Sequence, residues 1–182
     1  AMFNVLGDGT SPLPTRPFQI PLGALIPQRV TNLLPACKNI GTTHITQNYY
    51  RPHSTEWNIG EAAGALAAFC LGQRQTPAAV YGNAELRRQF QVQLLGLGIP
   101  LYWYEDMPSG HPASSACQLL AQTAIWPGAS DHLFFHPDKT VEPSEMVRLL
   151  EIAGLPPDVL GAEKKSRAEV ARCIADLKFA LS

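Results

Sequence analysis

The stretch RVTNLLPACKNIGTTHITQNYYRPHSTEWNIGEAAGALAAFCL, residues 29–71, decides the fold of this chain. Its short apolar run from Leu33 to Cys37 predicts a buried strand, and Pro35 places that strand at a sheet edge or near its own end. A loop dense in polar and aromatic side chains follows, and then a helix rich in glycine and alanine. The stretch therefore predicts a strand, a loop and a helix in that order.

The helix is expected to start between residues 54 and 58. Thr55 is one candidate N-cap, and Asn58 with Glu61 three residues later is an alternative in the form of a capping box. Gly72 is expected to end the helix, because glycine readily adopts the left-handed conformation that follows a last helical turn.

The length of 182 residues allows one medium domain or two small ones, and an apolar fraction of 46% permits a core. A net charge of −1, with acidic and basic residues intermixed, argues against a nucleic-acid partner. The apolar stretches are too short to span a bilayer, so no membrane span is expected. No secretory signal pattern opens the chain, and a cytoplasmic location is favoured.

The four cysteines, Cys37, Cys70, Cys117 and Cys173, lie far apart and include no C-x-x-C spacing. No zinc or other metal site is therefore expected, and we interpret the cysteines as free or buried thiols.

The rest of the chain predicts mainly helices. Asn83 is expected to cap a helix that runs to about Leu95, and residues 101–104 are a candidate strand. Three further helices are predicted at Pro112 to Ala124, Pro143 to Ala153 and Arg167 to Leu181, the last with a capping box at Ser166 and Glu169. The expected fold class is mainly α with a few short β-strands (α+β). The expected division is a strand, loop and helix at 1–82 that form an incomplete α/β layer, a connecting helix and strand at 83–104, and a helical module at 105–182.

Five parts of the opening stretch stand in a recognisable order: Asn32 to Leu34, Ile40-Gly41, Thr43-His44, Arg51 and Gly60 to Gly64. This order resembles the last strand and helix of the cofactor domain in FAD-dependent oxidoreductases. In those proteins a segment N-L-L-x-A-G-x-x-I precedes T-H, an Arg and G-x-A-A-G. The Ala-Gly of that segment appears here as Ala36-Cys37, which removes the close approach that glycine permits.

The resemblance implies FAD as cofactor. It places Ile40, Gly41, Thr42 and Thr43 along the flavin from the strand end, and Ser54, Thr55 and Gly60 where the helix start meets the ring or the ribityl chain. It also implies that His44 and Arg51 lie on a loop facing the ring, where they are the candidate catalytic residues for proton transfer or substrate orientation.

No G-x-G-x-x-G turn, which holds the pyrophosphate in dinucleotide-binding domains, occurs in the chain. We therefore expect the chain to be a C-terminal fragment or domain that completes a flavin site. Its expected partner is an N-terminal FAD-binding half, in the same or a companion polypeptide, and it is expected to be inactive alone. Its small-molecule substrate is unknown.

Residues 103–150 resemble a unit of the S-layer-homology type. The matching residues are Asp106, Pro108, His111, Gly128, Phe135, Pro137, Asp138 and Glu145, and Ser166 to Glu169 looks like the start of another unit. Ser144 replaces an arginine of that pattern. We expect a helical packing module, with a non-enzymatic module for carbohydrate or protein interaction as the alternative.

A second alternative is a polysaccharide lyase or a lyase-associated protein, because some relatives of the flavin family carry xanthan-lyase-type labels. Asn48, Tyr49, Tyr50, Arg51 and His53 are residue types that β-elimination of a uronate requires.

Overall fold

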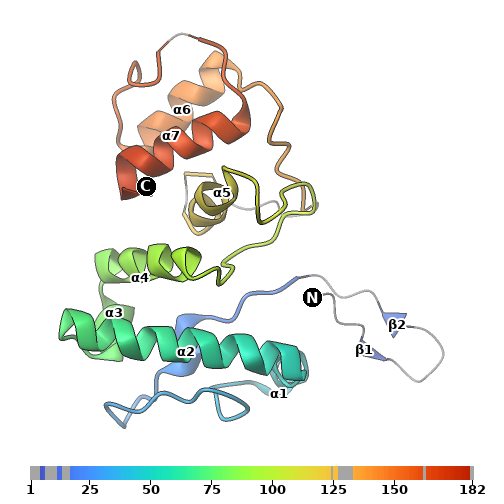
Figure 1. Cartoon of the computed structure of the whole chain (residues 1–182), viewed down its shortest axis with the longest axis vertical. Helices are drawn as coiled ribbons and strands as arrows, with labels where there is room; N and C mark the ends of the chain where they lie inside the picture. Colours follow the sequence, from blue (N-terminus) through green and yellow to red (C-terminus); the bar gives the residue numbers. More distant parts are fainter. Residues whose placement is uncertain are drawn as a thin grey trace. The chain divides into compact units, whose positions relative to one another are not determined.

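The computed structural model describes residues 17–123, 125–126, 133–161 and 163–180, together with the backbone of two short strands nearer the N-terminus. The chain divides into two compact units, unit 1 (residues 1–90) and unit 2 (residues 91–182). Helices make up most of the described chain (Figure 1). The predicted fold class, mainly α with a few short strands, is confirmed.

Unit 1 opens with β1 (Val5–Leu6) and β2 (Pro12–Leu13), which pair antiparallel. The 3-10 helix η1 (Leu22–Leu25) follows, then α1 (His44–Tyr50), α2 (His53–Gln73), α3 (Pro77–Gly82) and α4 (Ala84–Gly96). The division between the units falls inside α4. The described part of unit 1 contains no sheet beyond the β1–β2 pair, so an α/β layer is not seen in it.

Helix α2 starts earlier and ends later than the sequence predicts. Pro52, with an extended backbone, is its N-cap, so Thr55 and Asn58 lie inside the helix and the predicted start is wrong. The run of good helix formers continues past Gly72, and Arg74 ends the helix in the left-handed conformation at φ 52°. The backbone N–H of Arg74 donates to carbonyl oxygens of the last turn, which supports this C-cap.

Residues 44–50, expected to be a loop, form α1. Thr43 is the N-cap: its Oγ1 accepts the N–H of Thr46 at 3.2 Å, and its own N–H donates to Oγ1 of Thr46 at 2.8 Å. This reciprocal pair is a capping box made with threonine in place of glutamate. Two threonines three residues apart therefore start a helix that the apolar pattern does not predict.

The predicted strand at Leu33 to Cys37 is wrong, because this segment is irregular in the structure. Leu33 is 51% exposed, and the N–H of Cys37 donates to the side chain of Asn39 at 3.3 Å instead of to a neighbouring strand. A strand needs such a neighbour for its backbone groups, and the described part of unit 1 places none beside this segment.

A small core holds the start of α2 against the segments that precede it. It is formed by Leu25 of η1, Ile40, Tyr50 of α1, and Ile59 and Ala63 of α2. Because Ile40 is buried in this core, the turn around it is fixed beside the first turns of α2.

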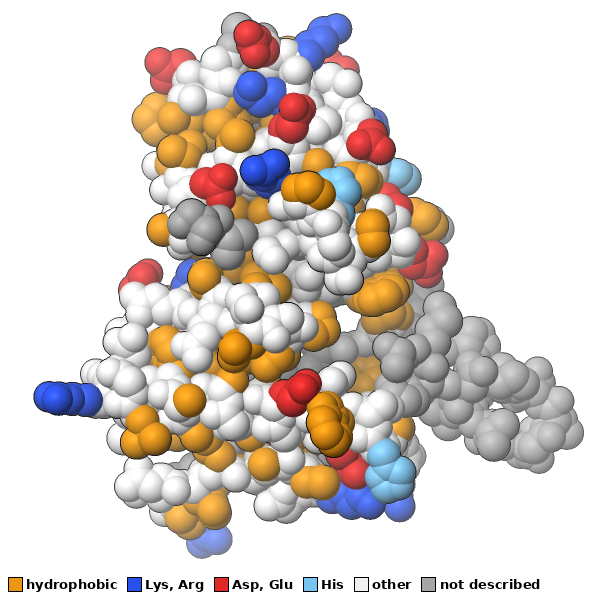
Figure 2. Space-filling model, viewed as in Figure 1, with side chains coloured by type: hydrophobic (Ala, Val, Ile, Leu, Met, Phe, Trp, Pro, Cys, Tyr) orange, Lys and Arg blue, Asp and Glu red, His pale blue; other side chains and the backbone are white. Residues whose placement is uncertain are grey.

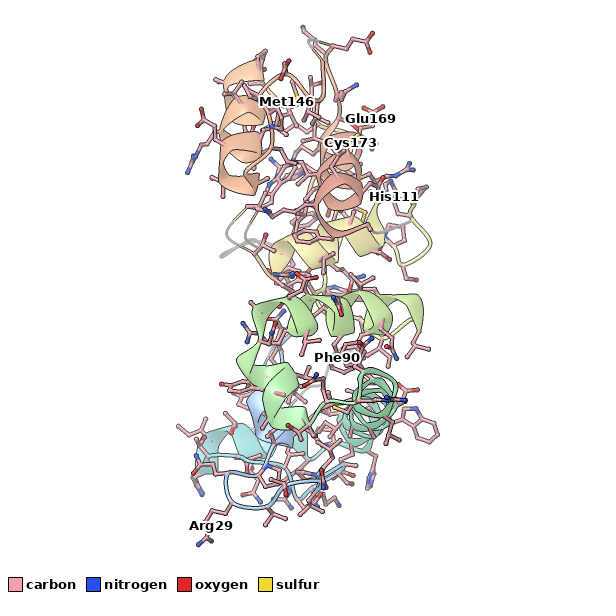
Figure 3. All side chains as sticks on the ribbon, turned by 90° about the vertical axis from the view of Figure 1, so that its left-hand side faces the viewer. Arg29, Phe90, His111, Met146, Glu169 and Cys173 are labelled. Carbon is pink, nitrogen blue, oxygen red and sulfur yellow. The ribbon has the colours of Figure 1, made fainter. Side chains whose placement is uncertain are left out.

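Helix α4 agrees with its prediction. Asn83 Oδ1 accepts the N–H groups of Glu85 at 2.9 Å and Leu86 at 3.1 Å, which confirms Asn83 as the residue that caps this helix. Phe90 extends from α4 toward α2 (Figure 3), where its ring centroid is 5.5 Å from that of Phe69.

Unit 2 is built from α5 (Ser114–Ala121), α6 (Pro143–Ala153) and α7 (Arg167–Phe179). All three helices were predicted. Pro143 opens α6 and Gly154 ends it at φ 69°, while the predicted capping box at Ser166 and Glu169 opens α7. α5 is shorter than predicted, and the predicted end points at Ala124 and Leu181 lie outside the described residues.

The predicted strand at residues 101–104 is wrong, since this segment is irregular. Gln118 of α5 takes the place of a strand neighbour: its Oε1 accepts the N–H of Leu101 at 2.9 Å and of Tyr102 at 3.3 Å. The ring of Tyr104 then enters the core of unit 2 and lies 5.3 Å from that of Phe135.

Two charged side chains tie distant segments of unit 2 together. Asp106 accepts the backbone N–H of Phe135 at 2.7 Å and of His136 at 2.6 Å. Arg167 donates from Nε to the carbonyl of Phe135 at 2.8 Å, and its guanidinium lies 4.5 Å from the ring centroid of Trp126. These contacts give the predicted motif residues Asp106 and Arg167 a structural role.

Candidate functional site

The predicted site residues lie on the segment before α1, at the two ends of α1 and on the first turns of α2. α2 begins at His53 without a side-chain cap on its N-terminus. The N–H groups of a first helical turn have no partner within the helix and carry a partial positive charge. This end of the 21-residue helix can therefore interact with a phosphate or with an electron-rich ring edge.

The first four predicted cofactor residues precede α1. Ile40 is buried in the core of unit 1, and the N–H of Gly41 donates to the carbonyl of Ala24 at 2.8 Å. Thr42 is exposed, and Thr43 is occupied in capping α1. Of these four, Thr42 and Gly41 have exposed surface that is not committed to the core or to the cap.

The next three predicted cofactor residues lie on α2. Ser54 and Thr55 belong to its first turn, with Ser54 exposed and Thr55 only 5% exposed. Gly60 lies about two turns further along, and a Cβ at this position would come 3.4 Å from the carbonyl oxygen of Ala36. Gly60 therefore gives room to the chain's own backbone, and Ser54 is the member of this group that faces solvent at the helix start.

The two predicted catalytic residues sit at opposite ends of α1. His44 is the first residue of the helix and Arg51 is its C-cap, and both side chains are exposed. Their predicted place on a loop is corrected, because residues 44–50 are helical. Their roles in catalysis stay predictions.

A cluster at the start of α2 was not among the predicted flavin-site residues, although His53 was named for the lyase alternative. Glu56 is 8% exposed, its Oε2 lies 3.2 Å from Nδ1 of His53, and its Oε1 lies 3.4 Å from Nζ of Lys38. Acidic, basic and histidine side chains gather on the surface beside this end of α2 (Figure 2). The spacing H-x-x-E after a proline signals the His53–Glu56 pair, while Lys38 is too far away in sequence to be foreseen.

Unit 2 has an open surface hollow lined by Asp106, His136, Pro137, Asp138 and Lys139. The Asp106 carboxylate is already bonded to two backbone N–H groups, and His136 Nδ1 lies 3.8 Å from it. None of the predicted flavin-site residues lines this hollow.

No cluster of three or more His, Cys, Asp or Glu side chains that could hold a metal ion occurs among the described residues. None of the helices described is both long and apolar enough to cross a membrane.

Residues 6–94 match the family model of the FAD dependent oxidoreductases. This range takes in α1, α2, α3 and every predicted flavin-site residue, so the match supports the predicted relation to FAD-dependent oxidoreductases over these residues. No curated protein and no solved structure matches the chain.

The other two predicted resemblances find no support in these comparisons. The matched range ends inside α4, so no match covers the residues thought to form an S-layer-homology unit. The relation to xanthan lyase is likewise without a match.

The family match implies FAD as the cofactor, and the start of α2 fits part of that molecule. The uncapped N-terminus of the helix and the exposed Ser54 hydroxyl are suited to hydrogen bonding with the ring edge or with an oxygen of the ribityl–phosphate chain. FAD bound there would supply the two-electron acceptor for substrate oxidation.

Proposed function

We propose that this chain is part of an FAD-dependent oxidoreductase and that its α1–α2 junction completes the flavin site. The match of residues 6–94 to the FAD dependent oxidoreductase family carries this proposal. The uncapped start of α2, which lies within the matched range, supports the placement of the flavin.

The backbone N–H groups of His53 and Ser54 are the first groups we assign to the flavin. They belong to the first turn of a long helix, where the aligned peptide dipoles favour electron-rich partners. Ser54 adds an exposed hydroxyl that can donate or accept. The role of His53 and Ser54 is to bind and orient the flavin. Ile40 and Ile59 hold the helix start in place by packing in the core of unit 1.

The pyrophosphate of FAD needs a second binding element, because the sequence has no G-x-G-x-x-G turn. In this proposal the element belongs to an FAD-binding half in the same or a companion polypeptide. Held by its α1–α2 junction alone, this chain binds FAD weakly and catalyses no turnover. Its substrate donates a hydride to the flavin in the complete site.

The proposal is tested by adding FAD to the isotope-labelled chain and following backbone amide signals by NMR. We expect the signals of residues 53–55 and of the neighbouring segment 41–43 to shift at millimolar FAD. Shifts confined to other residues, or none at all, would contradict the proposal.

Substitutions at Ser54 test the helix end itself. Ser54→Asp places a carboxylate in the first turn, which favours the helix but repels a phosphate or an electron-rich ring edge. We expect it to raise thermal stability slightly and to weaken FAD binding about fivefold, corresponding to roughly 1 kcal/mol. Ser54→Asn, which is neutral, is the matched control. Equal FAD affinities for the two variants would argue against binding at this helix end.

A further inference from the structure

The cluster of Lys38, His53 and Glu56 differs from an ordinary surface ion pair because its carboxylate is buried. Glu56 is 8% exposed, whereas its partners His53 and Lys38 are 91% and 61% exposed. The Oε1 atom of Glu56 is buried and accepts no hydrogen bond from the described residues, and the Lys38 ammonium lies 3.4 Å from it. Burying a carboxylate in this setting costs free energy, which makes Glu56 a candidate for a functional role.

The fold holds the three residues in place from both sides. Ile40, two residues after Lys38, packs in the same core as Ile59, which follows Glu56 by one helical turn. The turn that carries Lys38 is therefore anchored to the helix that carries Glu56, and the carboxylate is held between the ammonium and the imidazole.

The imidazole of His53 is oriented by this arrangement. Its Nδ1 faces Oε2 of Glu56 at 3.2 Å, and almost all of the ring is open to solvent. A carboxylate at Nδ1 favours the tautomer with the proton on Nδ1, which leaves Nε2 unprotonated and able to accept a proton. His53 is also the first residue of α2, at the helix end assigned to the flavin.

We propose that His53 accepts the substrate proton during flavin reduction, with Glu56 as the positioning residue and Lys38 as its anchor. This inference rests on the proposed function. The substrate is an alcohol or an amine: its C–H bond breaks with the hydride passing to the oxidised flavin, and its O–H or N–H proton passes to Nε2 of His53. A carbonyl or imine double bond forms, the flavin gains two electrons, and the proton leaves His53 for solvent.

His44, the histidine indicated by family resemblance, lacks these features. It is exposed at the first position of α1, and no hydrogen bond or ion pair of its side chain occurs among the described residues. A proton acceptor gains from a partner that fixes its tautomer, and His53 has one.

The tautomer of His53 in the full chain is the first test, and it needs no variant. Long-range proton–nitrogen NMR spectra are expected to show Nδ1–H and unprotonated Nε2 in neutral His53, with His44 as the internal reference. Glu56→Gln should abolish this preference, and Glu85→Gln, a matched change in the first turn of α4, should leave it intact. An Nε2–H tautomer in the unmodified chain would overturn the proposal.

Addition of FAD separates this inference from the proposed function. Shifts of the α2 first-turn amides together with the His53 ring signals support both. Shifts of those amides without any change at the His53 ring overturn the inference and leave the proposed function standing. The absence of both contradicts the proposed function.

In the flavin-loaded complex, His53→Gln is expected to lower the rate of flavin reduction by about 10²–10⁴-fold while FAD affinity stays the same. Glu56→Gln should give a smaller loss in kcat, because the imidazole is still present. An unchanged rate for His53→Gln, or a large loss for His44→Gln alone, would overturn the assignment.

Discussion

Units 1 and 2 are held together in different ways. In unit 2, polar side chains join segments far apart in sequence. Asp106 accepts the backbone N–H of Phe135, and Arg167 donates to the backbone carbonyl of Phe135. In unit 1, side-chain hydrogen bonds such as Trp57 to Glu61 and Thr43 to Thr46 join residues within one helical turn, and the ion pair of Lys38 with Glu56 is a longer link. The difference indicates that polar substitutions in unit 2 should act mainly on stability, and those around α2 mainly on function.

Both units bury apolar side chains completely. Unit 2 does so with Leu120, Leu150 and Ile174, one each from α5, α6 and α7. In unit 1, Leu66 of α2 is buried as completely, while Trp57 and Leu71 of the same helix are 72% and 81% exposed. Substitutions that change one hydrogen bond, one helix cap or one helical glycine in one unit at a time test this comparison.

The largest effect is expected from Asp106→Ala. It removes two short hydrogen bonds to a carboxylate and leaves the N–H of buried Phe135 without its acceptor, which should cost unit 2 about 3 kcal/mol. Burial raises the pKa of the Cys117 thiol to about 12, so this thiol reacts only when unit 2 opens. Labelling of Cys117, resolved by peptide mass spectrometry, should speed up about 100-fold.

Asp106→Asn keeps one acceptor oxygen and serves as the matched control for this change. Labelling of Cys70, a buried thiol of unit 1, should be the same in all three proteins. A parallel rise at Cys70 would break the distinction between the units.

A smaller loss is expected from Asn83→Ala, which removes the side chain that caps α4. Its cost should be about 1 kcal/mol, with faster hydrogen exchange at the amides of Glu85 and Leu86. Asn83→Ser, which retains a capping oxygen, should behave like the original chain. Unchanged exchange in Asn83→Ala would show that packing alone holds this helix end.

Gly64→Ala should stabilise unit 1 by roughly 0.5–1 kcal/mol, because alanine favours a helix and no atom of the described residues lies within 4 Å of the new Cβ. Gly60→Ala should gain less, since its Cβ meets the carbonyl oxygen of Ala36 at 3.4 Å. Denaturant unfolding of both variants measures the difference. A larger gain in stability for Gly60→Ala than for Gly64→Ala would show that the segment around Ala36 can move away from the new methyl group at little cost.

The smallest effect concerns the pH dependence of α7. Hydrogen bonds from the backbone and side chain of Ser166 lower the pKa of Glu169 below its ordinary 4.5. The capping contribution is therefore fully present above pH 4.5 and is lost as the pH falls through the lowered folded pKa. Glu169→Gln should remove this acid sensitivity of α7, as monitored by hydrogen exchange at its first turn. A persistent sensitivity in that variant would assign it to another group.

The helices that sequence predicted well carry their start and stop signals in adjacent residues. Asn83 before α4, Pro143 and Gly154 around α6, and Ser166 with Glu169 at α7 act within one turn. α1 and the true start of α2 were missed because the signals are unusual: a threonine pair in the first case and an uncapped proline in the second.

The site was harder to predict than the helices. The family pattern drew attention to His44, Arg51 and Gly60, which share the α1–α2 region but have separate surroundings. The link between Lys38 and Glu56 depends on the buried packing of Ile40 and Ile59, which no local pattern encodes. The predictions of strands were wrong for a related reason. The backbone groups of a strand need a neighbouring strand as hydrogen-bond partner, and at residues 101–102 the side chain of Gln118 accepts the backbone N–H groups instead.

The division between the units at Phe90 and Gln91 lies in the middle of α4. A protease cut or a gene truncation at that point would leave half a helix on each piece, with backbone groups stripped of partners on both sides. Separate expression of either unit therefore requires residues 84–96 to be present in both pieces.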